Sequence, residues 1–299
     1  MSANDLAGRH VWIDGRLEAA DALHLSAFDR GFQLGDGIFE TLRATGGHPT
    51  ELDEHLARLR SSAAGLDIEL PATVEADVAA GIAALLRADG MADPDGDASV
   101  RITVSRGVVA ARGLLPAPDG RATIAIQAWP VTPPPPSQLE RGLHLVASTV
   151  RRDPATPLAA LKTTSRADFD YARRAARRAG ADDALFLTID GMLSEATSAN
   201  IFLVRGSELA TPSLDCAILA GTTRTWILRW AAGAGLSVVE GHLRREDLTA
   251  ADEAFLCSSV AGILPVTRFD GAPIGAGKPG PWSTRARAAR EAFIRGGGA

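Results

Sequence analysis

Apolar and polar residues along this chain follow two different periods, which predict a mixture of amphipathic helices and short strands. The helical pattern covers residues 52–66, 74–88, 167–179 and 284–294, and a further helix is expected to begin at Thr222 or Thr223, with one of these threonines as its cap. Short apolar runs predict strands at 11–13, 37–43, 99–104, 122–127, 143–149, 184–189, 200–204 and 254–257, and the hairpin signal Asp14-Gly15 predicts one more short strand after the first. Because these strands and helices do not alternate regularly, the pattern favours an α+β fold over a doubly wound sheet.

A proline-rich segment divides the pattern into two parts. Residues 133–136 are four consecutive prolines, and they follow the strand-like run 122–127. Prolines lack a backbone N–H donor and favour an extended, semi-rigid chain, so the segment is typical of an interdomain linker. We therefore expect a domain at 1–129, a linker at 130–138 and a second domain at 139–299, which agrees with a length above that of one typical domain.

Composition and charge exclude several classes of protein. The net charge of −5 argues against a nucleic-acid groove, and no apolar run reaches the roughly 18 residues of a membrane span. Residues 1–5 have no basic stretch leading into an apolar one, so no signal peptide is expected. The two cysteines, Cys216 and Cys257, have neither metal-ligand nor redox spacing. The sequence thus predicts a cytoplasmic protein with reduced thiols and no metal site.

Lysine is almost absent from the chain. Of 31 basic residues, only Lys162 and Lys278 are lysines, and the rest are arginines. An arginine stays protonated and cannot act as a nucleophilic amine, so a lysine retained in this background is a candidate for amine chemistry. The foremost such chemistry is Schiff-base formation with a carbonyl substrate or with pyridoxal phosphate. Lys162 precedes a helical pattern, whereas Lys278 lies in a glycine- and proline-rich turn and is interpreted as a solvated loop residue.

Four further positions could hold an ionic cofactor. Glu195 lies among small polar residues before an apolar strand and could keep a pyridine nitrogen protonated, or it could be a solvated glutamate at a strand end. The turn 221–223 opens a helix, so it could bind phosphate or be an ordinary cap. Ser259 follows a strand and offers a hydroxyl to an anion. Arg58 could clamp a phosphate with two hydrogen bonds or be a surface charge.

In their order and spacing, these residues resemble the fold-type IV pyridoxal-phosphate enzymes, the class IV aminotransferase family. That family includes branched-chain and D-amino acid aminotransferases, (R)-selective amine transaminases and 4-amino-4-deoxychorismate lyases. The resemblance extends over roughly residues 10–290. Besides Lys162, the matching stretches are 28–31, 35–40, 55–59, 183–187, 195–202, 211–212, 221–224, 252–255 and 262–266.

The resemblance implies a two-domain α+β fold. The N-terminal domain would be an α/β sandwich-like domain, the C-terminal domain a pseudo-barrel, and pyridoxal 5′-phosphate would lie between them. In this family the active site is completed across a homodimer, so a homodimer that acts on small molecules is expected.

The resemblance also implies roles for individual residues. Lys162 would form the internal aldimine and move a proton between the substrate and the cofactor, and Glu195 would pair with the pyridinium nitrogen. The remaining implied contacts are the phosphate for Arg58, Thr222, Thr223 and Ser259, and the substrate for Phe39, Arg101, Arg106 and Val260.

Two reactions fit the resemblance. Ala167 and Leu34 stand where many branched-chain enzymes carry aromatic residues, which weakens that specificity, while Arg166 and the stretch 105–107 are similar to the lyases. Four arginines, at 43, 101, 106 and 112, could neutralise a dicarboxylate, or could lie near the site by chance in an arginine-rich chain. The expected reaction is transfer of an amino group between an amino acid or amine and a 2-oxo acid. The alternative is a 4-amino-4-deoxychorismate lyase that releases pyruvate and 4-aminobenzoate.

Two other interpretations are weaker. A homologue without activity is disfavoured because both Lys162 and Glu195 are retained. The pair Gly277-Lys278 hints at a phosphate-binding loop, but Pro279 replaces the Ser or Thr that this motif requires. A nucleotide-hydrolysing enzyme is therefore not expected.

Overall fold

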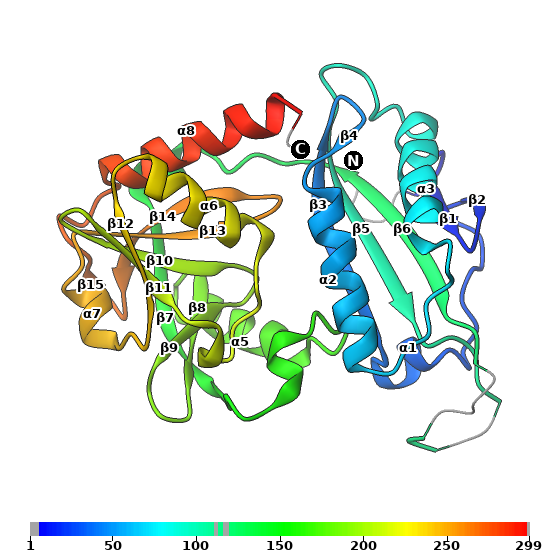
Figure 1. Ribbon diagram of the computed structural model, residues 1–299, viewed down its shortest axis with the longest axis horizontal. Coiled ribbons are helices and arrows are strands. Elements are labelled where there is room, and N and C mark those ends of the chain that lie inside the picture. The colour runs from blue at the N-terminus through cyan, green and yellow to red at the C-terminus, as the bar shows by residue number, and fades with distance from the viewer. Residues whose placement is uncertain (1–5, 111–112, 116–119, 298–299) are drawn as a thin grey trace. The chain divides into compact units, whose positions relative to one another are not determined.

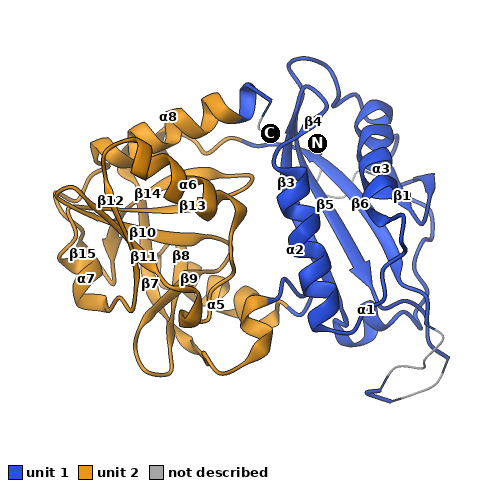
Figure 2. Ribbon diagram, viewed as in Figure 1, with its two compact units in different colours: residues 1–132, 161–165, 294–299 blue, residues 133–160, 166–293 orange. Residues whose placement is uncertain are grey.

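The computed structural model describes residues 6–110, 113–115 and 120–297. The chain forms two compact units (Figure 2). The first consists of Met1–Thr132, Leu161–Ser165 and Ile294–Ala299, and the second of Pro133–Ala160 and Arg166–Phe293. The chain first passes from the first unit to the second between Thr132 and Pro133. The short segment Leu161–Ser165, which contains Lys162, belongs to the first unit although its neighbours on both sides belong to the second.

The first unit is built on a six-stranded antiparallel sheet with the order β2-β1-β6-β5-β3-β4 (Figure 1). Its strands are β1 (His10–Ile13), β2 (Arg16–Ala19), β3 (Gly37–Thr45), β4 (His48–Pro49), β5 (Asp97–Ser105) and β6 (Thr123–Pro130). Its helices are α1 (Arg30–Leu34), α2 (Leu52–Gly65) and α3 (Val74–Ala88). The predicted hairpin at Asp14-Gly15 is confirmed, because β1 and β2 pair on either side of it.

Alternation along the central strands separates two faces of this sheet. Val100 and Ile102 of β5 are buried in one core with Leu59 of α2 and Ile82 of α3, so the two helices cover that face. Arg101 lies between Val100 and Ile102 and therefore points to the opposite face. Residues of β3 follow the same rule, with Glu40 toward the helices and Phe39 away from them.

The second unit contains a nine-stranded sheet with the order β12-β11-β10-β13-β14-β7-β8-β9, and β15 pairs with β14. The strands are β7 (Leu143–Arg152), β8 (Asp183–Thr188), β9 (Leu193–Ala196), β10 (Asn200–Arg205), β11 (Glu208–Pro212), β12 (Ser237–Gly241), β13 (Glu253–Ser258), β14 (Gly262–Phe269) and β15 (Ala272–Pro273). The last strand, β9, also contacts β10 and β11, so the sheet curves back on itself as a half-barrel. The α+β fold class, with one open sheet and one curved sheet, is thus confirmed.

Helices surround the curved sheet (Figure 1). They are α4 (Pro136–Arg141), α5 (Ala167–Arg178), α6 (Thr222–Gly233), α7 (Arg245–Thr249) and α8 (Pro281–Arg295), with two 3₁₀ turns, η1 (Pro157–Ala160) and η2 (Leu214–Cys216). Apolar side chains of α6 and α8, such as Ile227 and Ala286, share a core with Phe202 and Phe255 of the sheet. No helix in the described part of the chain is long and apolar enough to cross a membrane.

Three local predictions are wrong in detail. The strand predicted at 122–127 extends to Pro130 as β6 and pairs with β5, so it includes the first residue of the predicted linker 130–138. The predicted linker also overlaps α4, which begins at Pro136, since proline is well suited to the first turn of a helix. The helix α6 is capped by Gly221 rather than by Thr222 or Thr223, both of which lie within its first turn.

Candidate active site

Lys162 is fixed by backbone pairing with the start of β3. The Phe39 N–H donates to the Lys162 carbonyl at 2.9 Å, and the Thr164 N–H donates to the Gly37 carbonyl at 2.8 Å. The Lys162 N–H itself donates to the Ser62 hydroxyl of α2 at 3.1 Å. The segment Leu161–Ser165 therefore lies against the sheet like a short additional strand, and the base of the lysine side chain is held rigidly.

Glycines of the first unit make this close approach feasible. A Cβ atom on Gly37 would lie 2.6 Å from the Val104 carbonyl oxygen and 3.1 Å from the Thr164 hydroxyl. Gly35 has a positive φ of 65°, and a Cβ there would lie 2.6 Å from the Ser165 hydroxyl. A larger residue at Gly35 would displace the segment that carries Lys162, and one at Gly37 would clash first with the backbone of β5 and also press on Thr164.

Phe39 brings two cations together on the face of the sheet that the helices do not cover. The Lys162 Nζ lies 4.6 Å from the centre of the Phe39 ring, and the Arg101 guanidinium lies 3.9 Å from it. The negative face of an aromatic ring attracts a cation, so the ring holds both groups without neutralising either one. Phe39 itself is only 7% exposed and forms a rigid apolar support.

Arg101 is a partly buried cation. Its Nε donates to the Thr103 hydroxyl at 3.1 Å, and within the described residues no carboxylate pairs with its guanidinium. Burial lowers the pKa of Arg101, although an arginine remains protonated at neutral pH. Such a group is suited to receive a carboxylate from a small molecule.

Arg58 is not the surface charge that one interpretation expected. Its guanidinium donates to Glu40 through two bonds, from Nε at 2.8 Å and from Nη2 at 2.6 Å, and His55 Nδ1 lies 2.7 Å from the same carboxylate. Burial alone would raise the pKa of Glu40, but the hydrogen bonds and charges of Arg58 and His55 outweigh burial and lower it from 4.5 to about 2. The first turns of α2 and the middle of β3 are thereby joined by a buried ionic group.

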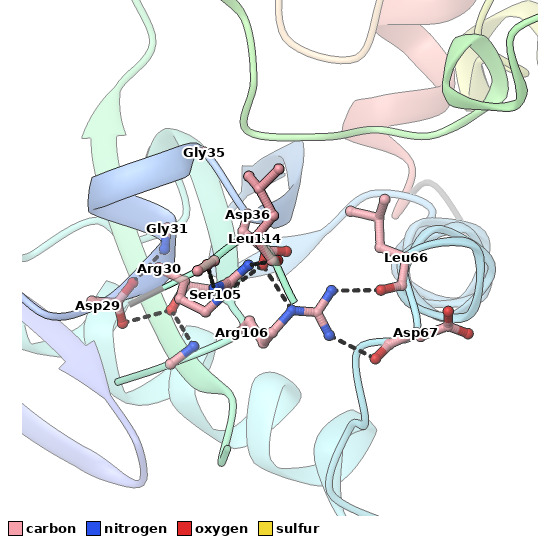
Figure 3. Close-up of polar contacts among 12 residues, drawn as sticks. Asp29, Arg30, Gly31, Gly35, Asp36, Leu66, Asp67, Ser105, Arg106 and Leu114 are labelled. Carbon is pink, nitrogen blue, oxygen red and sulfur yellow. Dashed lines mark hydrogen bonds and ion pairs between the residues drawn. The ribbon is translucent and has the colours of Figure 1, made fainter. Parts of the chain in front are cut away.

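Arg106 lies in a network beyond the end of β5 (Figure 3). Its Nε donates to Asp36 at 2.8 Å, and its two terminal nitrogens donate to the Leu66 and Asp67 carbonyls at 2.6 and 2.8 Å. Arg30 binds the same Asp36 carboxylate at 2.7 Å. Burial raises the pKa of Asp36, but the two arginines outweigh burial, so the carboxyl titrates below its usual range. Arg106 thus ties α2 to the turn before β3.

The structure separates the four arginines that the sequence grouped as a dicarboxylate site. Arg43 is held by Asp97 on the neighbouring strand through contacts of 2.7 and 2.5 Å, and Arg106 by Asp36. Arg112 lies outside the described residues. Arg101 is the member of this group that lies beside Phe39 and Lys162.

In the second unit, Glu195 is a buried residue of β9. It is 7% exposed, which excludes the solvated strand-end glutamate that the sequence left open. Its Oε2 accepts a hydrogen bond from the Leu219 N–H at 3.1 Å, and Arg152 Nη2 lies 4.0 Å from its Oε1. The sequence did not reveal Arg152 as a neighbour, because one buried arginine carries no distinguishing signal in so arginine-rich a chain. A buried carboxylate of this kind can accept a hydrogen bond from a protonated ring nitrogen.

The beginning of α6 has features that suit an anion. Gly221 is its cap and has no side chain to accept from the first N–H groups, and a Cβ there would lie 2.2 Å from the Asn200 Oδ1. The Thr222 hydroxyl lies 3.3 Å from the Ser259 hydroxyl. Thr223 instead turns toward the buried Arg290, whose Nη2 is 3.4 Å from the Thr223 hydroxyl. The helix dipole and the charge of Arg290 both favour an anion here.

Ser259 and Val260 lie in the turn between β13 and β14. Ser258 pairs with Gly262, so the turn consists of the three intervening residues, and both Ser259 and Val260 are partly exposed. Gly262 has a φ of 68°, a conformation that favours glycine and closes this turn. The Ser259 hydroxyl of this turn therefore lies near the first turn of α6.

The residues present fit the chemical parts of pyridoxal 5′-phosphate. Lys162 would supply the amine that an aldehyde requires, Glu195 would supply a buried carboxylate for the ring nitrogen, and the α6 N-terminus with Thr222 and Ser259 would supply donors for a phosphate. This fit rests on the helix start that a glycine caps and on the buried carboxylate of β9.

A model of the family described as amino-transferase class IV matches residues 37–269. The chain belongs to the class IV aminotransferase family. Both this match and the relatives below identify it as an enzyme of that family. It is 36% identical to a Methanocaldococcus jannaschii protein that carries the name of a branched-chain-amino-acid aminotransferase, over 87% of this chain and 88% of the relative. It is 32% identical to the aminodeoxychorismate lyase of Bacillus subtilis, over 87% and 86%.

The fold of this class IV enzyme is similar to that of solved members. The branched-chain aminotransferase of the archaeon Thermoproteus uzoniensis, solved with norvaline, gives a TM-score of 0.87 at 27% identity, covering 97% of this chain and 95% of that one. A second branched-chain amino acid aminotransferase, solved with pyridoxamine 5′-phosphate, gives a TM-score of 0.90, also at 27% identity, over 98% of this chain and 96% of that one. The family is thus settled, while its members' names include both an aminotransferase and a lyase.

Proposed function

We propose that this protein is a pyridoxal-phosphate-dependent aminotransferase that moves an amino group between an amino acid, or an amine, and a 2-oxo acid. The observation that carries the proposal is Lys162, one of two lysines in the chain, whose Nζ is held over Phe39 by backbone pairing of its segment with β3. When bound, the cofactor supplies an electron sink for charge that develops at the substrate's α-carbon. Lys162 would hold the cofactor covalently and would then take a proton from that carbon.

Further residues are proposed to hold the ring and the phosphate of the cofactor. Glu195 would keep the ring nitrogen protonated, and its bond from the Leu219 N–H would orient the carboxylate for that task. Arg58, the Thr222 and Thr223 amides and the Ser259 hydroxyl would hold the phosphate. Arg58 would do so from its ionic group with Glu40, which already fixes the position of its guanidinium.

Arg101 supports a substrate with a second carboxylate. Its guanidinium is partly buried, rests on Phe39, and has no carboxylate partner within the described residues. A dicarboxylic amino acid or 2-oxo acid would offer the missing charge, while Phe39 would contact the carbon chain. The Ser259 and Val260 amides are proposed to bind the carboxylate next to the reacting carbon. Arg106 is not part of this proposal, because its donors are taken by Asp36 and two carbonyls.

A homodimer in the cytoplasm is proposed as the working form. Two adjoining loops of the first unit, joined by the bridge between Asp29 and Val108, carry exposed apolar side chains. Those with the largest exposure are Leu23, Leu25, Phe28, Phe32, Val108, Leu114 and Leu115. Exposed apolar side chains on these segments and on α1 suit an interface with a second copy.

Elimination of pyruvate from 4-amino-4-deoxychorismate is the second candidate reaction. It is favoured by the identity of 32% to the Bacillus subtilis lyase and by Ala167, which departs from the branched-chain pattern. Both reactions would use the same lysine and cofactor. In transamination the amino group stays on the cofactor, whereas in the lyase reaction the substrate is cleaved and pyruvate is released.

The absorbance spectrum of the purified protein with pyridoxal phosphate tests these proposals. Single L- and D-amino donors would be titrated in turn, glutamate and aspartate among them. We expect one donor to convert the long-wavelength band of lysine-linked cofactor to the pyridoxamine band, and a 2-oxo acid to restore it. A band unresponsive to every donor, together with pyruvate release from 4-amino-4-deoxychorismate, would instead establish the lyase. Absence of any lysine-linked band would overturn both reactions.

A further inference from the structure

Three side chains with different metal-binding atoms converge at one edge of the curved sheet in the second unit. Asp215 and Cys216 lie in η2, directly after β11, and His242 directly follows β12. One ligand atom of each residue lies within 4.8 Å of the other two. His242 Nε2 is 2.7 Å from Asp215 Oδ2, and Cys216 Sγ is 4.0 Å from Asp215 Oδ1.

The topology of the sheet explains why they meet. β11 and β12 are neighbouring parallel strands in which Pro212 pairs with Gly241, and the Ser213 N–H donates to the Gly241 carbonyl at 3.1 Å. Adjacent parallel strands end at the same edge, so the residues that follow them lie side by side. Asp215 and His242 are 27 positions apart along the chain. The site contains only one of the two cysteines and a histidine that is far from it in sequence. The spacing between the two cysteines, on which the expectation of no metal site rested, therefore could not indicate it.

We propose that Asp215, Cys216 and His242 form a binding site for a divalent transition-metal ion of the Zn²⁺ class. A thiolate, an imidazole and a carboxylate together suit Zn²⁺, whereas Mg²⁺ and Ca²⁺ take oxygen ligands. At ordinary bond lengths to zinc, tetrahedral ligand atoms lie about 3.3–3.7 Å from one another. The observed separations end on the two oxygens of Asp215, with His242 Nε2 2.7 Å from Oδ2 and Cys216 Sγ 4.0 Å from Oδ1, so binding of the ion requires the side chains to rotate until one atom of each lies at these distances.

Exposure of two of the three ligands suits an ion that enters from solvent. The side chains of Asp215 and His242 are 65% and 58% exposed, so water can fill the fourth position. Cys216 is 2% exposed, and its Sγ faces Asp215 and the Ser213 hydroxyl, 3.6 Å away. An ordinary surface ion pair accounts for the contact of Asp215 with His242 but gives no reason for a thiol directed at the same point.

A metal ion here would restrain the segment that leads into α6. Three residues after Cys216, the Leu219 N–H donates to Glu195 and its carbonyl accepts from the Asn200 side chain at 3.0 Å. The carbonyl of Ala217 accepts from the Ser194 hydroxyl at 3.1 Å. The metal would therefore join the ends of β11 and β12 and fix the loop that supports Glu195. The site itself does not depend on the proposed reaction, because none of its three ligands has a role there.

Calorimetric titration of Zn²⁺ into chelator-treated holoenzyme without an affinity tag tests the proposal. We expect one ion per chain. Cys216→Ser and His242→Ala should each lower the affinity by at least about tenfold, since changes even in residues that only support a ligand cost about 10–100-fold. His48→Ala, an exposed histidine of the first unit, is the matched control and should leave the affinity unchanged.

Two further readouts keep the proposal falsifiable. Co²⁺ in place of Zn²⁺ should give the intense visible bands of tetrahedral coordination, and these should be lost in Cys216→Ser. The His242→Ala variant alters an exposed side chain and should fold, as circular dichroism will check. Zinc binding that both variants retain, or the absence of one-to-one binding in the parent protein, would overturn the site.

Discussion

The two units of the molecule carry their candidate residues in different ways. In the first unit several buried or partly buried charges are matched by partners of opposite sign, as in the Arg58–Glu40–His55 group and in the network of Arg106. The two cations beside Phe39 are held by an aromatic ring. In the second unit the candidates are one buried carboxylate, the first turn of α6 and two hydroxyls.

This difference indicates which side chains remain able to bind or act on a small molecule. Arg106 gives its donors to Asp36 and two carbonyls, whereas Arg101 rests on the Phe39 ring and has no carboxylate partner within the described residues, so a neighbouring carboxylate does not balance its charge. By the same reasoning a helix start capped by glycine keeps its affinity for an anion. Substitutions that break each kind of support should therefore affect different properties of the enzyme.

Replacing Lys162 should have the largest effect. Lys162→Ala removes both the amine that links the cofactor and the base, so we expect turnover to fall by about 10⁴-fold or more. Reduction with borohydride followed by mass spectrometry should show the cofactor adduct in the parent protein and none in the variant. Lys278→Ala, which changes the only other lysine, should keep both the adduct and the turnover. An adduct retained in Lys162→Ala would contradict the role of this residue.

Acid should next break the ionic group of the first unit. Because the pKa of Glu40 is lowered from 4.5 to about 2, its contribution to stability is present above pH 4.5 and is lost as the pH falls toward 2. The shift corresponds to roughly 3 kcal/mol at neutral pH. Urea denaturation between pH 7 and pH 2.5 should show this loss, and Glu40→Gln should show a lower free energy of unfolding at pH 7 with a shallower dependence on acid. Equal slopes for the two proteins would contradict the pairing.

Replacing Glu195 should break the corresponding support in the second unit. The neutral amide of Glu195→Gln cannot hold the ring nitrogen protonated, so turnover should fall on the order of 10²-fold while the cofactor stays bound. Glu208→Gln, an exposed glutamate of β11, is the control. Steady-state rates and the cofactor content of each variant provide the measurement. Unchanged turnover in Glu195→Gln would show that the buried carboxylate does not act on the ring.

The sequence predicted much of the fold because most strands and helices carry their own pattern. The strands β3, β5 and β13 and the helices α2 and α3 were found from apolar spacing alone. β9, with the residues Leu-Ser-Glu-Ala, was missed because a strand that carries Glu195 and a serine on buried faces shows no apolar alternation. The longer β11, β12 and β14 were missed as well, and so were most of the short turns and helices.

The candidate site was predicted as a set of residues but not as an arrangement. Whether Arg101 or Arg106 faces the site depends on where β5 ends and on how it pairs with β3. The local sequence pattern predicts neither the end of the strand nor its pairing. Pairing of the segment Leu161–Ser165 with β3 joins residues more than a hundred positions apart, beyond the reach of local patterns. The partners of Arg106 are likewise set by tertiary structure.

The contrast between Arg101 and Arg106 gives the last and smallest expected effect. A charged hydrogen bond to a substrate carboxylate contributes about 1.5–3 kcal/mol, so Arg101→Met should raise KM about 10- to 100-fold for a dicarboxylic substrate and little for an apolar one. Arg106→Met removes the bonds to Asp36, Leu66 and Asp67, so it should lower the melting temperature and leave the preference between substrates unchanged. Kinetics with paired acidic and apolar substrates, together with thermal melts, separate the two outcomes. If Arg101→Met changed only the melting temperature, its guanidinium would be one more structural charge, and the distinction between ring-held and carboxylate-held cations would fail.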